Sequence, residues 1–528
     1  MVILFFKLSN PYKVSIYNYE SYLNKEIVNK IKQNYSYHVF TNLDEFTRAI
    51  KNKKAVAGVS SDYQIAQLIL EKKLKKINFQ KAFNVQYDQS NKNKVILSLY
   101  SLDTLEQFNF YDKWIIDEIK KINPTNKTTI LNNKNDNFIP FIYYENNKAI
   151  GFEIDGQEGI DNFYEFLIPY FTLDKMIVYN EENSEVYKTT RNNVVKNSDF
   201  SNVKDGDSWE NILSKLSKKY KKPKFYWTNW FLDNAMIGQF YRYDSGFVNE
   251  KNNNGSWRMF DKNNYRLYFD SFNEFVEKTT GDSIKNVFKN KLVTDGQELV
   301  SGIIEPISGK ADIAIMYNGD ALDAYYGRDN FSTLDEDNNI SFVRPKYTYK
   351  NIDAWIISSD TDDYDSDILL ERLNKYIFND VSKDYKDLHK QYILNVYNEL
   401  MNNNPNRENN HYLTELFNEN NFDKPKNIDQ ISKNFFVKRF EEFKLAFANP
   451  SLPNISNFDT INYTPSYKNI KNFLKDWYFL NKSKKIDYKA LSIFDLDTAK
   501  NVEFRAYQPL DLELRTKMID YYYQKTKS

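Results

Sequence analysis

The sequence of 528 residues lacks cysteine altogether. This excludes disulfide bonds, thiolate catalysis and cysteine-based metal sites, and we expect no lipid anchor on an N-terminal cysteine. Histidine is almost as scarce. His38, His389 and His411 lie far apart and without the spacing of metal ligands. We therefore expect no metal site and no histidine-based catalytic triad.

Net charge is absent as well, because 72 basic residues balance 72 acidic residues. Nothing in this balance favours a nucleic-acid partner, and we expect none. Long apolar runs are missing too. The N-terminal MVILFF is too short to span a bilayer and lacks the pattern of a signal-peptide cleavage site, and no other run approaches membrane length.

Aromatic residues, by contrast, are abundant, with 41 tyrosines and 39 phenylalanines. Lysine, asparagine and isoleucine are abundant together with them, which is typical of an AT-rich genome. A single tyrosine is therefore weak evidence for a binding site, and each must be judged by its position.

The first 73 residues alternate between short apolar segments and amphipathic segments of about a dozen residues. This pattern predicts a parallel α/β sheet with crossover helices. The predicted strands are residues 13–19, 37–41 and 55–60, and the predicted helices are residues 23–33, 43–51 and 63–73.

Later segments are less uniform. Residues 85–137 are rich in asparagine and lysine and have a less regular pattern, whereas residues 138–144 and 149–154 predict a hairpin. Residues 283–292 predict a helix. Residues 352–358 predict a strand, and most of residues 385–447 predict helices.

One central stretch, residues 311–326 (ADIAIMYNGDALDAYY), combines an alternating strand with the start of a helix. Asp320 is predicted at this strand-to-helix edge, where open α/β sheets bind ligands, with Tyr317 shortly before it. A carboxylate beside an aromatic ring suits an organic cation. Equally, Asp320 could simply cap the helix and Tyr317 could belong to the core.

Several short blocks together resemble the spermidine/putrescine-binding proteins of ABC transporters. The central YNGD (317–320) matches the aromatic-x-Gly-Asp of that family most closely. The other blocks are YNYESY (17–22), VSSDY (59–63), IPFIY (139–143), AIG (149–151), SW (208–209), TNWFLD (228–233), NID (351–353) and NYTP (462–465). Asn229 and Trp230 stand where the family commonly has acids, and Asn351 replaces an aromatic residue.

The resemblance implies an α/β, two-lobed type II periplasmic-binding-protein fold with a helical C-terminal insertion. It predicts a first lobe from residues 12–147 and 319–365, and a second lobe from residues 148–318 and 366–528. The insertion is expected at about residues 385–454.

The resemblance further implies an extracellular solute-binding protein, held at the outer face of the cell membrane and delivering a polyamine to an ABC permease. We expect a monomer without enzymatic activity and without a cofactor. The acids implied at the ligand are Glu20, Asp233, Asp320 and Asp353, and the other implied ligand contacts are Tyr19, Ser21, Tyr22, Ser61, Tyr63, Tyr143 and Tyr317.

Three other functions stay open at this stage. The same fold could bind another organic cation, such as thiamine, or an amino-acid derivative. Paired carboxylates in an aromatic cleft also occur in carbohydrate-active enzymes. A surface adhesin or scaffold could use the C-terminal insertion as its contact. The sequence also leaves open whether Glu20 or Ser21 faces the ligand.

Overall fold

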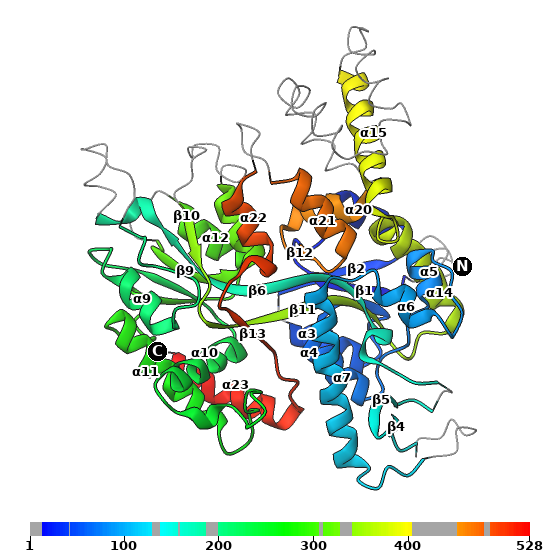
Figure 1. Cartoon of the computed structure of the whole chain (residues 1–528), viewed down its shortest axis with the longest axis horizontal. Helices are drawn as coiled ribbons and strands as arrows, with labels where there is room; N and C mark the ends of the chain where they lie inside the picture. The colour runs from blue at the N-terminus through cyan, green and yellow to red at the C-terminus, as the bar shows by residue number, and fades with distance from the viewer. Residues whose placement is uncertain are drawn as a thin grey trace, which may run out of the picture.

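The structure is a computed structural model that describes residues 13–41, 43–128, 138–156, 159–185, 199–305, 310–327, 340–403, 451–479 and 486–527. A sheet of eleven strands runs through both halves of the molecule (Figure 1). Its main path is β2 (Ser36–Phe40), β1 (Ser15–Tyr19), β3 (Ala57–Ser61), β11 (Tyr347–Ile357), β6 (Ile168–Asn180), β9 (Ile313–Tyr317), β7 (Phe225–Thr228) and β8 (Asn290–Val293). The short strands β10 (Ile340–Val343) and β12 (Thr464–Pro465) pair with β6, and β13 (Glu503–Ala506) pairs with β11.

The first lobe is built on the parallel strands β2, β1 and β3. Their connections are the helices α2 (Lys25–Lys32) and α3 (Leu43–Lys51), and α4 (Asp62–Leu70) follows β3 directly. The alternation expected in the first 73 residues is therefore confirmed. The lobe also contains α5 (Phe79–Phe83), α6 (Lys92–Leu97), α7 (Leu102–Ile122) and the hairpin β4 (Phe141–Glu145) and β5 (Lys148–Glu153).

The second lobe is built on a second parallel group, β8, β7 and β9. Its helices are α9 (Trp209–Ser217), α10 (Phe231–Asp244), α11 (Tyr265–Thr280), α12 (Gly296–Ile304), α13 (Asn318–Tyr325), α22 (Tyr488–Phe494) and α23 (Leu512–Thr526). The side chain of Ser208 accepts a hydrogen bond from the backbone N–H of Asn211 and so caps α9.

Two long antiparallel strands, β6 and β11, connect the lobes, and every residue of both is buried. The start of β6 pairs with the end of β11 in the first lobe, and the end of β6 pairs with β9 in the second. The short strand β12 pairs with β6 between these two regions, at Phe171 and Thr172. The crossing segments thus form one hydrogen-bonded ribbon, and the predicted two-lobed α/β fold is confirmed.

One predicted element is wrong. Residues 283–292 do not form a helix but a turn followed by β8. The reason is that the side-chain amide of Asn290 donates to backbone oxygens of Asp282 and Ser283, which favours a turn over helical hydrogen bonds. Residues 85–128, part of the stretch with the less regular pattern, contain α6 and α7, and the apolar side chains of α7 are buried at helical spacing between its many polar residues.

The C-terminal part contributes elements to both lobes. The helix α14 (Asp363–Leu373) packs against α5 of the first lobe, whereas α13 packs against α12 of the second. The helices α20 (Pro453–Ile461) and α21 (Lys468–Trp477) contact β12, and α22 and α23 return to the second lobe. Of the expected insertion, α15 (Tyr385–Asn403) packs on α21 and projects from the molecule (Figure 1), and residues 404–450 lie outside the described residues.

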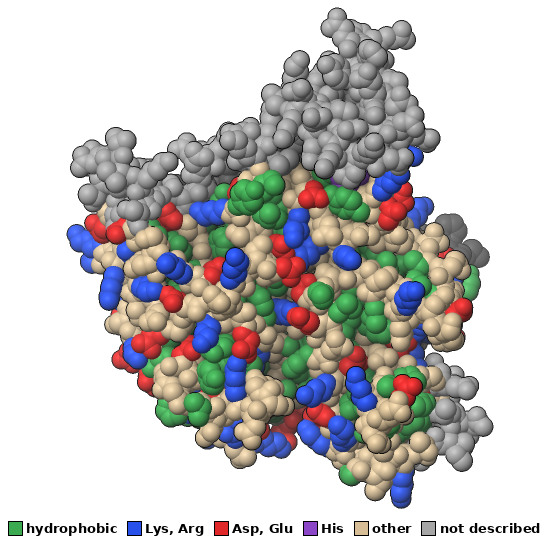
Figure 2. All heavy atoms as spheres, in the orientation of Figure 1, with side chains coloured by type: hydrophobic (Ala, Val, Ile, Leu, Met, Phe, Trp, Pro, Cys, Tyr) green, Lys and Arg blue, Asp and Glu red, His purple; other side chains and the backbone are tan. Residues whose placement is uncertain are grey.

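Within the described ranges, no helix is both long and apolar enough to cross a lipid bilayer. On the face seen in Figure 2, lysine and arginine side chains are intermixed with aspartate and glutamate, as the equal numbers of both kinds lead one to expect.

Candidate functional site

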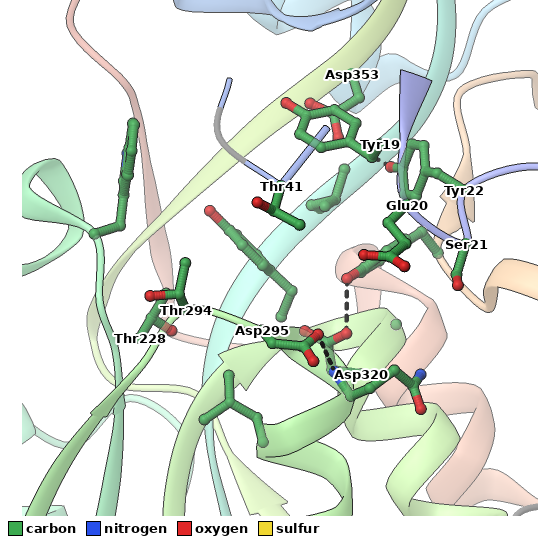
Figure 3. Close-up of a pocket in the computed structure, with 18 of the residues that line it drawn as sticks. Tyr19, Glu20, Ser21, Tyr22, Thr41, Thr228, Thr294, Asp295, Asp320 and Asp353 are labelled. Atoms are coloured by element: carbon green, nitrogen blue, oxygen red, sulfur yellow. Dashed lines mark hydrogen bonds between the residues drawn. The ribbon is translucent and has the colours of Figure 1, made fainter. Parts of the chain in front are cut away.

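A cavity of about 380 Å³ lies between the two lobes, beside the crossing strands. Figure 3 shows Tyr19, Tyr22 and Asp353 on one side of it and Asp295 and Asp320 on the other. The first-lobe wall comes from the ends of β1 and β3, from β11 and from the segment after α20. The second-lobe wall comes from β7, β9, α12 and α13.

Asp353 is a buried carboxylate in the first-lobe wall, only 4% exposed. It lies on β11 where the pairing with β6 shifts register, a local irregularity that can re-aim a side chain. Its Oδ1 accepts hydrogen bonds from Ser61 Oγ at 2.6 Å and Asn351 Nδ2 at 3.1 Å, and its Oδ2 accepts one from Tyr22 Oη at 3.0 Å. All three donors are neutral. Burial raises the pKa of the Asp353 carboxyl from 3.8 to about 6, although these hydrogen bonds oppose the shift.

Asp320 provides the corresponding carboxylate in the second-lobe wall. It lies in the first turn of α13, and its Oδ1 accepts a hydrogen bond from Tyr463 Oη at 2.8 Å. This contact needs Gly319, because a Cβ atom there would lie 2.2 Å from the Tyr463 ring. Removal from water raises the pKa of the Asp320 carboxyl to about 6, while the Tyr463 hydroxyl and the positive charge of Lys175 oppose the rise.

Lys175, on β6, lines the same cavity but is turned inward to Asp233. The side chains of both residues are 0% exposed, and Lys175 Nζ lies 3.0 Å from Asp233 Oδ2. The ammonium also donates to Thr228 Oγ1 at 2.9 Å and lies 3.3 Å from the centroid of the Tyr317 ring. Burial lowers the pKa of Lys175, and the nearby Asp233 carboxylate acts against this.

Aromatic rings connect the two walls. The Tyr63 ring from the first lobe stacks on the Tyr507 ring from the second, with centroids 5.2 Å apart. Tyr507 Oη donates to Asp233 Oδ1 at 2.6 Å and lies 2.8 Å from Tyr317 Oη. On the first-lobe side, the rings of Tyr19 and Tyr22 lie 5.3 Å apart in an edge-on arrangement. The cavity therefore has apolar ring faces between its carboxylates.

Nine of the eleven predicted ligand contacts line this cavity: Tyr19, Glu20, Ser21, Tyr22, Ser61, Tyr63, Tyr317, Asp320 and Asp353. In Figure 3 the carboxylate of Glu20 is directed towards the centre of the cavity, whereas Ser21 lies at its edge. The other two predicted contacts are not in the lining. Asp233 lies behind Lys175, and Tyr143 lies on the hairpin strand β4.

The sequence interpretation missed several residues of the cavity. Lys175 and its neighbour Asp174 are the charged residues of an otherwise largely apolar strand, IPYFTLDKMIVYN, and this contrast is a signal that could have identified Lys175. Tyr463 lies within the block NYTP that supported the resemblance. Trp230 and Asp295 follow the ends of β7 and β8 and Asp323 lies within α13, all without a distinctive pattern. Tyr507 follows β13 near the C-terminus.

Within the described residues, one group of acids could hold a metal ion: Glu153, Asp155 and Asp161, whose oxygen atoms lie within 4.8 Å of one another. Lys76 Nζ already lies 2.6 Å from Asp161 Oδ1 and 3.6 Å from Asp155 Oδ1. The lysine thus supplies positive charge to this group, which lies at the end of the β5 hairpin strand.

Two α/β lobes joined by crossing strands, with a cavity between them, define the type II periplasmic-binding-protein fold. No family model matches the chain, and no curated protein sequence matches it. Solved structures do match along nearly the whole chain.

One of these is described as a spermidine/putrescine ABC transporter from Listeria monocytogenes, with 12% identity, coverage of 97% of this chain and 98% of that chain, and a TM-score of 0.46. Another is the spermidine/putrescine ABC transporter substrate-binding protein of Streptococcus pneumoniae, with 14% identity, the same two coverages and a TM-score of 0.44. A third is an ABC transporter solute-binding protein of Thermotoga lettingae bound to tagatose, with 10% identity, coverages of 88% and 99% and a TM-score of 0.39. All three scores lie below 0.5, so what this cleft binds must follow from its own side chains.

Proposed function

We propose that this chain is the extracellular solute-binding component of an ABC importer and that it captures a polyamine in the cleft between its lobes. The observation that carries this proposal is the pair Asp320 and Asp353. These carboxylates lie in opposite walls of one cavity, and their side-chain hydrogen-bond donors within the described residues are neutral hydroxyl and amide groups.

A carboxylate removed from water is unfavourable unless a cation meets it. The pKa of Asp353 is raised to about 6 because burial is opposed only by hydrogen bonds from neutral groups and not by a nearby cation. An ammonium group of a ligand would supply the charge, and the methylene chain between two ammonium groups would lie against the tyrosine rings. Ring faces attract ammonium groups too, by about 0.5–2 kcal/mol per contact.

A ligand that binds both carboxylates would join the two lobes, because Asp353 belongs to the first and Asp320 to the second. Closure of two lobes around a ligand is a known hinge motion of binding proteins. In this proposal the closed, loaded monomer delivers the polyamine to a permease at the outer face of the membrane. The ligand leaves unchanged, since the protein acts as a carrier and not as an enzyme.

The test is isothermal titration of the purified chain with putrescine, spermidine and spermine. The matched control ligand is 1,4-butanediol, which has the length of putrescine without its charges. We expect one-to-one binding of at least one amine and no binding of the diol. The variants Asp320→Asn and Asp353→Asn should each weaken binding, whereas Asp117→Asn, at an exposed carboxylate on α7, should not.

Thiamine belongs in the same titration, because it is a cation of different shape. Binding of thiamine without binding of any polyamine would replace the ligand class and keep the solute-binding role. If the wild-type protein binds none of the amines, and both cleft variants fold normally, the proposal is refuted.

A further inference from the structure

The cleft contains a cation of its own. Lys175 Nζ lies between the Asp233 carboxylate at 3.0 Å and the Thr228 hydroxyl at 2.9 Å, and it lies 3.3 Å from the centre of the Tyr317 ring. An acid, a hydroxyl group and a ring face are the environment that a bound ammonium group requires. This environment is already complete without a ligand.

The side chain of Lys175 has the same chemical structure as part of a polyamine. Four methylenes that end in an ammonium group are an aminobutyl group, and putrescine and spermidine contain the same unit. Lys175 enters from β6, lines the cavity and puts its ammonium against Asp233. It therefore occupies the space and the charge partner that one arm of a longer polyamine would use.

The remaining charges of the cleft can be assigned one by one. Asp233 is neutralised by Lys175, so Asp320 and Asp353 are left to receive a ligand. Glu20, Asp295 and Asp323 also line the cavity. Glu20 and Asp295 are exposed, and Asp295 accepts the backbone N–H of Gln297 at the start of α12. Asp323 is only partly buried and accepts a hydrogen bond from the side-chain amide of Gln297 at 3.2 Å. Exposed carboxylates contribute little to binding, because water screens them.

We propose that Lys175 is a built-in aminobutyl cation that fills one amine position of the cleft, so that the preferred ligand is a linear diamine and not a tri- or tetraamine. This inference rests on the proposed function and specifies its ligand class. Cavity volume alone does not make the selection, because Lys175 both fills the space beside Asp233 and neutralises that carboxylate. With that position filled, Asp320 and Asp353 are the two carboxylates that we assign to the ammonium groups of the ligand.

The first experiment compares 1,4-diaminobutane, 1,5-diaminopentane and spermidine by isothermal titration of the wild-type protein. We expect at least one diamine to bind ten times more tightly than spermidine. If no amine binds, the proposed function fails. If amines bind but spermidine binds as tightly as the diamines or more tightly, this inference is overturned while the proposed function stands.

The second experiment uses Lys175→Ala, which removes the aminobutyl group and leaves Asp233 without its cation. We expect the affinity for spermidine to rise at least tenfold relative to that for 1,4-diaminobutane. Lys175→Met is the matched control, because it keeps the length of the side chain without its charge and should show no such gain. Equal ligand preference in the wild type and in Lys175→Ala would mean that the lysine is only a structural ion-pair partner, and would overturn the inference.

Lys175→Ala leaves Asp233 buried without its cation, and this variant can fail to fold for that reason. The double variant Lys175→Ala/Asp233→Asn covers this case, because it leaves no unpaired carboxylate. It removes both charges, so it should retain the preference for diamines and gain nothing for spermidine. A preference for spermidine in the double variant would show that space and not charge selects the ligand, which contradicts the inference.

Discussion

Replacing Asp353 with asparagine should have opposite effects on stability and on binding. In the unliganded protein, burial raises the pKa of this carboxyl from 3.8 to about 6. A difference of about 2 pKa units corresponds to about 3 kcal/mol between the ionised and the protonated form. At pH 7 the ionised carboxylate thus destabilises the folded state, and we expect Asp353→Asn to raise the free energy of unfolding by about 1–3 kcal/mol.

The pH dependence of this gain has a defined sign. Because the folded-state pKa lies above the unfolded-state value, the destabilisation is complete above pH 6 and disappears as the pH falls towards 4. The two proteins should therefore have similar stability at pH 4. The surroundings can accept an amide, since Ser61 and Tyr22 can reorient their hydroxyl groups. In addition, Asn351 Oδ1 has no hydrogen-bond partner within the described residues and could accept the new N–H after an amide flip.

Binding should change in the other direction. Loss of one partner of a buried charge pair weakens binding by about 2–5 kcal/mol, roughly a 30- to 4,000-fold rise in Kd. Urea unfolding without ligand at pH 7 and pH 4 gives the stability, and isothermal titration with the preferred amine gives the affinity. A variant that is less stable at pH 7 than the wild type, or one that binds the amine equally well, would refute this reasoning.

Three further predictions concern the same cleft and its closure. Amine affinity should fall roughly 100-fold between pH 8 and pH 5. The reason is that Asp320 and Asp353, with pKa values of about 6, are each about one-tenth ionised at pH 5. An affinity that does not change over this pH range would contradict the prediction. Asp233→Asn leaves Lys175 buried without its carboxylate, so the free energy of unfolding measured in urea should fall by about 3–5 kcal/mol. A fall of less than about 1 kcal/mol would argue against a stabilising ion pair. Arg515→Met removes the ion pair between α23 of the second lobe and Asp44 on α3 of the first. It should speed ligand release by about tenfold in stopped-flow fluorescence with little change in the association rate, whereas an unchanged release rate would exclude a role in closure.

The sequence predicted the walls of the cleft better than its interior. Asp320 and Tyr317 could be found because a strand and a helix follow one another within one stretch, and this local pattern indicates where the two residues lie. Asp353 could be found because a carboxylate in an apolar strand needs a special environment. Both arguments use only residues close together in the chain.

The interior of the cleft depends on pairs that are distant in sequence. Lys175 and Asp233 come from β6 and α10, and no local pattern indicates that their charges meet. Tyr507 reaches the cavity only because β13 returns to pair with β11. Asp233 was predicted as a ligand contact from its block alone, and its burial behind Lys175 depends on the packing of two strands and a helix.

The ribbon formed by β6, β11 and β12 has a consequence for how an importer could detect loading. Strands that share ladder hydrogen bonds resist sliding and twisting, because either movement breaks several bonds at once, but they can bend together. The ribbon would then act as a broad hinge between the two lobes. The two lobes would then move relative to each other mainly by changing one hinge angle. If the proposed function is correct, a permease would need to read only the angle between the lobes to distinguish the occupied protein from the empty one.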